Sequence, residues 1–223
     1  MENAELINRR EALRYLSCTD EKAAEGTSII DECADELLKV LNPKYIYRYF
    51  DIEFSGNEVI VSGARLLLKG KDIVSHLEGC SGVYLIAATL GPGADRLIRT
   101  LQISDMAKAV TADAFASAAV EELCLAAERE IRDEVPGRYF TWRYAPGYGD
   151  FDIEIQKNFL DVLDAPRKIG LCTSDSRLLV PVKSVTSVMG VSENPLPERA
   201  RGCITCGMRE KCKFRKSGNH CGF

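Results

Sequence analysis

The residues best suited to bind a small ligand lie in the run Arg143-Tyr144-Ala145-Pro146-Gly147-Tyr148, directly after the only tryptophan, Trp142. A guanidinium presents a planar fork that matches a carboxylate or a phosphate bidentately. Proline followed by glycine reverses the backbone and can bring Tyr148 back beside Arg143 around a ligand. Taken alone, the pattern favours a strand that ends in a polar turn over a ligand site.

Four cysteines near the C-terminus form a second candidate site, with the spacing C-x2-C-x5-C-x8-C: Cys203, Cys206, Cys212 and Cys221. So short a segment cannot bury enough apolar surface to fold alone, so a metal or disulfides must organise it. Interleaved arginines and lysines would offset the negative charge of four thiolates. The uneven spacing favours an iron–sulfur cluster, with zinc as the alternative and a tail without metal as the third possibility.

A third set of polar residues recurs every four positions in an alanine-rich segment: Asp113, Ser117 and Glu121. At this spacing the three side chains share one face of a helix. From periodicity alone, this stripe is best interpreted as the solvated face of that helix.

Periodicity and turn residues predict the elements that must position these groups. We expect helices over residues 20–42, 71–77, 94–101, 105–132 and 152–163. We expect extended segments over residues 45–54, 58–62, 83–90, 138–143, 168–173 and 183–190. The stretch Pro195-Leu196-Pro197 marks a boundary. The sequence therefore predicts an α+β body over residues 1–196 and a cysteine-rich, metal-binding tail over residues 197–223.

Composition narrows the class of protein. The chain has 223 residues, 28% of them charged, and a formal net charge of −4, which argues against binding nucleic acid through bulk charge. No apolar run is long enough to span a membrane and the first residues do not form a signal peptide, so we expect a cytoplasmic protein. The cysteines outside the tail are predicted to be buried free thiols: Cys18, Cys33, Cys80, Cys124 and Cys172.

Two further patterns resemble cofactor motifs but lack an essential residue. Gly91-Pro92-Gly93-Ala94-Asp95-Arg96 follows an expected strand, but Arg96 stands where a dinucleotide fingerprint needs a small residue. His76-Leu77-Glu78-Gly79 has the H-x-x-G order of cobalamin-binding domains, but Val74 stands where their aspartate belongs. We therefore expect His76 to be a surface helix residue and any corrinoid to be held by a partner.

Several segments together resemble the activation domain of cobalamin-dependent methionine synthase. The order R-x-x-x-G-Y in residues 143–148 is similar to the S-adenosylmethionine-binding signature of that family. Residues 83–91 resemble its early buried strand and turn, residues 105–132 its long central helix, and residues 171–187 its T-E-S…P…S-V-S segment. The resemblance covers roughly residues 8–192. Departures after Gly147-Tyr148 and in the Ser174-Asp175-Ser176 element indicate a stand-alone form of the domain.

This resemblance implies a mainly antiparallel twisted sheet with a long central helix and a site for S-adenosylmethionine. The positions that match the family's ligand contacts are Glu121, Arg143, Ala145, Gly147 and Tyr148. Arg143 would bind the ligand carboxylate, and Tyr148 would offer an aromatic face to the cationic sulfonium. Ala145 would contribute backbone hydrogen bonds.

The function implied by the resemblance is the reactivation of a separate cobalamin-dependent methionine synthase or related corrinoid methyltransferase by reductive methylation. A flavodoxin or ferredoxin would supply the electron, and an iron–sulfur cluster in the tail could relay it. One alternative is a non-catalytic S-adenosylmethionine-binding subunit or sensor that docks on a corrinoid protein. A third interpretation is a metal-tail interaction protein whose ligand site is vestigial. No nucleophile–base pair is evident, so positioning and electrostatics would be this chain's contribution to the methyltransferase system.

Overall fold

The computed structural model describes residues 3–16, 27–197, 210–211 and 216. The helices, in chain order, are η1 (Asn3–Leu6), α1 (Arg9–Tyr15), α3 (Thr27–Val40), α4 (Lys71–Leu77), α5 (Pro92–Ser104), α6 (Met106–Glu134), η2 (Ile153–Ile155), α7 (Gln156–Leu163) and α8 (Ala165–Ile169). The strands are β1 (Lys44–Ser55), β2 (Glu58–Val61), β3 (Leu66–Lys69), β4 (Gly82–Thr89), β5 (Tyr139–Phe140), β6 (Cys172–Thr173), β7 (Leu179–Val180) and β8 (Ser184–Ser192).

Six strands form one sheet in the order β3-β2-β1-β4-β8-β5, and every neighbouring pair is antiparallel. β6 and β7 form a separate two-stranded hairpin. The predicted α+β class and mainly antiparallel sheet are thus confirmed. β4 lies near the centre of the sheet and every one of its residues is buried, which explains its uninterrupted apolar sequence.

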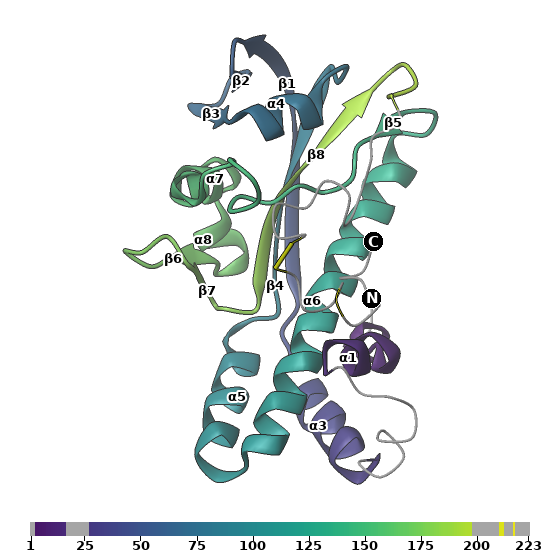
Figure 1. Ribbon diagram of the computed structural model, residues 1–223, viewed down its shortest axis with the longest axis vertical. Coiled ribbons are helices and arrows are strands. Elements are labelled where there is room, and N and C mark those ends of the chain that lie inside the picture. Colours follow the sequence, from purple (N-terminus) through teal and green to yellow (C-terminus); the bar gives the residue numbers. More distant parts are fainter. Residues whose placement is uncertain (1–2, 17–26, 198–209, 212–215, 217–223) are drawn as a thin grey trace.

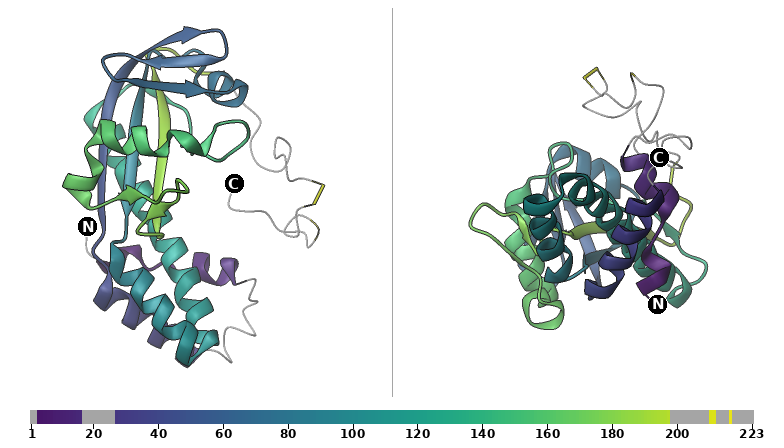
Figure 2. Two further views of the ribbon diagram at one scale, coloured as in Figure 1. Left: turned by 90° about the vertical axis from the view of Figure 1, so that its left-hand side faces the viewer. Right: turned by 90° about the horizontal axis from the view of Figure 1, so that it is seen from below.

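Helices cover both faces of the sheet (Figure 1). α6 runs along one face, where Ala127 and Ile131 pack against Ile86 of β4 and Met189 of β8. On the opposite face, α4, α7 and α8 pack over the alternate residues of the same strands, in a core that includes Leu85. The side view in Figure 2 shows the sheet at one end of the molecule and the helical layer extending beyond it.

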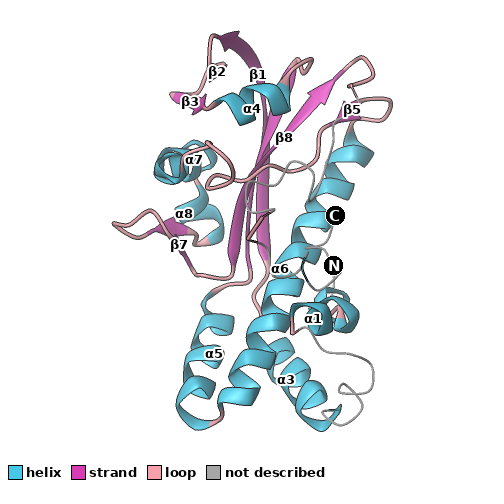
Figure 3. Cartoon of the chain, in the orientation of Figure 1, coloured by secondary structure: helices cyan, strands magenta, loops and turns pink. Residues whose placement is uncertain are grey.

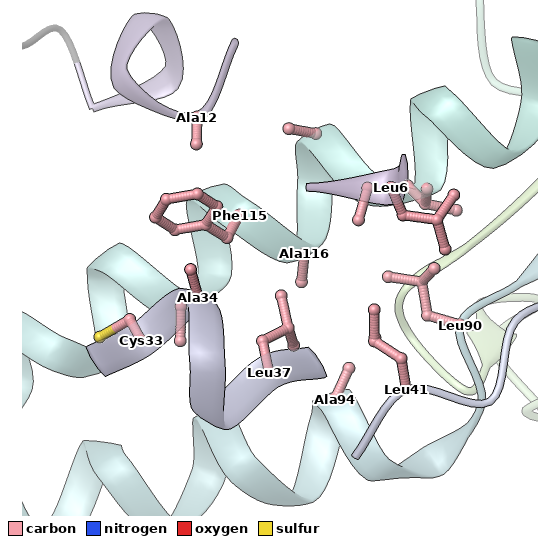
Figure 4. Close-up of a cluster of buried hydrophobic side chains, with 14 of the residues drawn as sticks. Leu6, Ala12, Cys33, Ala34, Leu37, Leu41, Leu90, Ala94, Phe115 and Ala116 are labelled. Carbon is pink, nitrogen blue, oxygen red and sulfur yellow. The ribbon is translucent and has the colours of Figure 1, made fainter. Parts of the chain in front are cut away.

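At the helical end of the molecule, α1, α3, α5 and α6 enclose a second hydrophobic core (Figure 3). Leu37 of α3 and Phe115 of α6 are fully buried there, with Leu90 directly after β4 (Figure 4). Alanines on the inner side of α6 allow these helices to approach closely, and the absence of glycine and proline from Met106 to Glu134 supports so long a helix.

Several sequence predictions need correction. The segment 168–173 is not extended throughout, because α8 occupies Ala165–Ile169 and begins with a proline in its first turn, where proline is tolerated. Only Tyr139 and Phe140 of the expected strand 138–143 form regular pairs, followed by an isolated bridge at Tyr144.

Side-chain burial brings two further corrections. His76 is 4% exposed and therefore not a surface residue, because α4 turns this side toward the segment after β5. Cys33, Cys80 and Cys124 are buried free thiols as predicted, whereas Cys172 is exposed on the β6–β7 hairpin. Cys18 lies outside the described residues.

Candidate functional site

The segment after β5 runs along the edge of β8 and then crosses the sheet toward α7 (Figure 1). Thr141 N donates to Gly190 O at 3.0 Å, and Tyr144 and Val188 exchange two backbone hydrogen bonds of 2.8 Å. Because successive side chains of an extended chain point to opposite faces, Arg143 reaches α6 while Tyr144 packs into the core beneath α4 and α7.

Arg143 lies between two carboxylates of α6. Its Nη2 donates to Glu121 Oε2 at 3.0 Å, and its Nε donates to Glu128 Oε1. Glu121 and Glu128 are two helical turns apart, so they share one face of α6. The side chains of Arg143 and Glu128 are each 15% exposed, whereas that of Glu121 is 43% exposed. The guanidinium is thus held from the inside by Glu128 and from the solvent side by Glu121.

Burial and charge set the protonation states of this cluster. Burial works against the charge of Arg143, but the neighbouring acidic groups outweigh it and raise the pKa of the guanidinium above its ordinary value. Cys124 lies on α6 between the two glutamates and is fully buried, which raises the pKa of its thiol to about 12. Burial, and then the charge of Glu121, raise the pKa of Tyr15 at the end of α1. The thiol of Cys124 is therefore neutral, and Arg132 adds a second guanidinium to the cluster, with its Nη2 3.8 Å from Glu128 Oε2.

The remaining stripe residues of α6 bind a second cation. Lys183 Nζ lies 2.9 Å from Asp113 Oδ1 and donates to Ser117 Oγ at 2.8 Å. The stripe Asp113-Ser117-Glu121 is therefore not simply a solvated face. It faces two basic side chains, Lys183 directly before β8 and Arg143 in the segment after β5, so this edge of α6 carries alternating charges.

The turn that follows Arg143 is closed by its own backbone. Tyr148 N donates to Ala145 O at 3.3 Å, and Gly147 N donates to Phe151 O at 2.7 Å. Gly147 has φ +95°, a conformation that favours glycine. Tyr148 is 63% exposed, and its ring centroid lies 6.3 Å from that of Tyr144.

Of the five ligand positions expected from the sequence, the structure joins Arg143 and Glu121 directly. Ala145, Gly147 and Tyr148 follow in the turn, where Tyr148 lies beside Tyr144. Sequence reasoning missed Glu128, although its position seven residues after Glu121 placed it on the same helix face.

The tail cysteines Cys203, Cys206, Cys212 and Cys221 lie outside the described residues, so an iron–sulfur or zinc site there stays a prediction. Within the described part of the chain, no group of three or more histidine, cysteine, aspartate or glutamate side chains is arranged to hold a metal ion. Among those same residues, no helix combines the length and the apolar character needed to cross a membrane.

Comparisons with known proteins bear on the fold. No protein-family model matches the sequence, and no curated protein matches it either. Among solved structures, the chain is similar to the MetH reactivation domain bound to AdoHcy, with a TM-score of 0.59 and 15% sequence identity over 83% of this chain and 70% of that chain. The body of this chain therefore has the α+β fold of the MetH reactivation domain, as the resemblance in its sequence predicted.

Proposed function

We propose that this protein binds S-adenosylmethionine beside Arg143 and supports the reactivation of a separate cobalamin-dependent methionine synthase or related corrinoid methyltransferase. The observation that carries the proposal is the Glu121–Arg143–Glu128 cluster at the start of the R-x-x-x-G-Y turn. It occurs in a chain with the fold of a domain that is bound to AdoHcy, the demethylated form of this ligand.

The donors of Arg143 suit the ligand carboxylate. A guanidinium has five N–H donors, and the described bonds use only its Nε and Nη2. Its Nη1 has no partner among the described residues and is available for a carboxylate oxygen. Because Glu128 fixes Nε from the buried side, the fork is already oriented before a ligand arrives, which lowers the entropic cost of binding.

The charge of the cluster suits the rest of the ligand. Arg132 Nη2 also lies 3.8 Å from Glu128 Oε2, so Glu128 faces two guanidiniums and Glu121 is the carboxylate on the solvent side. S-adenosylmethionine carries an ammonium, a sulfonium and one carboxylate, and is therefore a net cation. Glu121 is the more exposed carboxylate and would attract the cationic groups, and Tyr15, which lies close enough to feel its charge, would add an aromatic face. The donor set therefore fits this ligand.

When bound, S-adenosylmethionine would transfer its methyl group as a cation to cob(I)alamin on the partner, after one-electron reduction of cob(II)alamin, and leave S-adenosylhomocysteine. Arg143 would hold the carboxylate of the ligand and Glu121 its cationic side. The role of this chain is binding and orientation, which can contribute several kcal/mol by proximity alone.

The partner and the electron donor extend this proposal. The corrinoid would be supplied by the methyltransferase, and a flavodoxin or ferredoxin would deliver the electron. The tail over residues 197–223 would form a separate unit in which Cys203, Cys206, Cys212 and Cys221 hold an iron–sulfur cluster, or alternatively zinc. An iron–sulfur cluster would be an electron relay, and zinc would make the tail a docking element.

Methyl transfer tests the proposal against a sensor that only binds the ligand. The protein is incubated anaerobically with a cobalamin-loaded methionine synthase, a chemical reductant and S-adenosylmethionine labelled in its methyl group. We expect label in the cobalamin at a rate that depends on this protein and falls in Arg143→Ala. Ligand binding without label transfer would favour the non-catalytic sensor instead.

A further inference from the structure

The turn that carries Gly147 and Tyr148 is attached to α4 at both of its ends. Asp72 and His76 lie four residues apart in α4 and therefore share one face of the helix. His76 contacts the chain just before Arg143, and Asp72 contacts it just after Tyr148. Ile73 and Leu77, on the inner side of α4, are fully buried and anchor the helix to the core of the sheet.

In the contact after Tyr148, each of two aspartate carboxylates accepts a hydrogen bond from the backbone N–H of the other residue. The Asp150 carboxylate accepts hydrogen bonds from Lys71 N at 2.7 Å and from Asp72 N at 3.0 Å. In return, Asp150 N donates to Asp72 Oδ2 at 3.2 Å. Bonds from the amides of Asp72 and Lys71 lower the pKa of Asp150, so it accepts them as a carboxylate. The first turn of α4 and the end of the ligand turn therefore satisfy each other's polar groups.

The contact before Arg143 uses a buried histidine. His76 Nε2 donates to Trp142 O at 2.8 Å. Its ring centroid lies 4.8 Å from that of Trp142, in an edge-on arrangement, and 4.9 Å from that of Tyr144, on which it stacks. Trp142 and Tyr144 flank Arg143, so the histidine holds the backbone before that residue and the side chain after it.

Two glycines leave the space that the aspartate contact requires. A Cβ on Gly70 would lie 2.5 Å from Asp150 Oδ1, and one on Gly149 would collide with Asp72 Oδ2. Both glycines also have positive φ, of 133° and 55°. A side chain at either position would push α4 and the turn apart.

We infer that α4 is the positioning element of the ligand turn and that Asp72, Asp150 and His76 are positioning residues for it. The inference rests on the proposed function. The exposed side of the turn has little packing of its own, as the exposure of Tyr148 shows. The two attachments to α4 act together with the backbone bonds to Val188 and the buried Phe151 in setting the geometry of the turn relative to Arg143. Loss of either attachment enlarges the set of conformations from which the ligand must select, which weakens binding.

The inference is tested by titrating S-adenosylhomocysteine into the full chain and into Asp150→Ala, Asp72→Ala and Asp150→Asn. We expect about tenfold weaker binding for the alanine variants, with thermal midpoints close to that of the parent. Asp150→Asn retains one acceptor oxygen and should be intermediate. Asp152→Ala is the matched control, because this aspartate of the same loop bonds only Glu154 N and does not contact α4 among the described interactions. Binding by both alanine variants within twofold of the parent would overturn the inference.

Hydrogen exchange separates this inference from the proposed function. If the parent does not bind the ligand, the proposed function fails, but the attachment is still measurable. The amides of Gly147 and Asp150 should exchange at least about tenfold faster in Asp72→Ala than in Asp152→Ala. Equal exchange in the two variants would show that α4 does not position the turn. Faster exchange with unchanged ligand affinity would equally reject the positioning role.

Discussion

Glu128 offers a quantitative test of how Arg143 is held. Removal of one partner from a fully buried ion pair costs about 3–5 kcal/mol, because the other charge is left without compensation. Two features reduce that cost here. The side chains of Arg143 and Glu128 are 15% exposed, so water can reach them, and Glu121 keeps its bond to Nη2 at 3.0 Å. We therefore expect Glu128→Ala to lower the free energy of unfolding by about 1.5–3 kcal/mol, the cost of a hydrogen bond to a charged group.

Two variants separate charge from hydrogen bonding and from helix propensity. Glu128→Gln keeps an acceptor oxygen for Arg143 Nε and should cost only about 0.5–1.5 kcal/mol. Asp133→Ala removes an exposed carboxylate of the same helix that takes part in none of the described ion pairs, and should lie within about 0.5 kcal/mol of the parent. Urea unfolding followed by far-ultraviolet circular dichroism measures all three. The reasoning is refuted if Glu128→Ala is no less stable than Asp133→Ala at an unchanged slope against urea.

Three further predictions concern the site. Glu121→Gln should weaken binding of S-adenosylmethionine more than that of S-adenosylhomocysteine, because only the first carries the sulfonium charge; equal losses in titrations of the two ligands would contradict this. Cys124 should resist alkylation at pH 8, where a pKa of about 12 leaves roughly one thiolate in ten thousand, while exposed Cys172 reacts. Peptide mapping after iodoacetamide treatment checks this, and rapid labelling of Cys124 in the folded protein would show that it is not buried. Gly147→Ala should cost about 1–2 kcal/mol through its positive φ alone, since its Cβ meets open space, whereas Gly149→Ala also collides with a carboxylate and should cost more. Thermal or urea unfolding shows which of the two variants is less stable, and equal stability would be inconsistent with the described turn.

Local patterns predicted the elements whose signals lie within one stretch of chain. The alanine-rich segment 105–132 matches α6 to within two residues, and the apolar run 83–90 matches β4 to within one. The strand Leu66–Lys69 was missed because its three consecutive leucines show no alternation in sequence, although their burial alternates. The pairing of β4 with both β1 and β8 joins residues distant in sequence, and only the folded chain shows it.

In the candidate site too, the sequence could not show which distant residues meet in the folded chain. The resemblance named Glu121 and Arg143, but not Glu128, which becomes relevant only when Arg143 lies against that face of α6. His76 was assigned to the surface because seven residues of helix do not reveal which side is covered. Its burial depends on Trp142 and Tyr144, which reach α4 through the path of the chain after β5.

The most direct test of the account is a calorimetric titration of S-adenosylmethionine into the anaerobically purified protein, with Arg143→Ala and Arg143→Lys alongside. The account predicts saturable binding by the parent and about 10- to 100-fold weaker binding by Arg143→Ala, the loss expected for a charge-assisted hydrogen bond. Arg143→Lys keeps the charge but lacks the planar fork, and should recover only part of the affinity. Absence of binding by the parent, or equal affinity in Arg143→Ala, would contradict the proposed site.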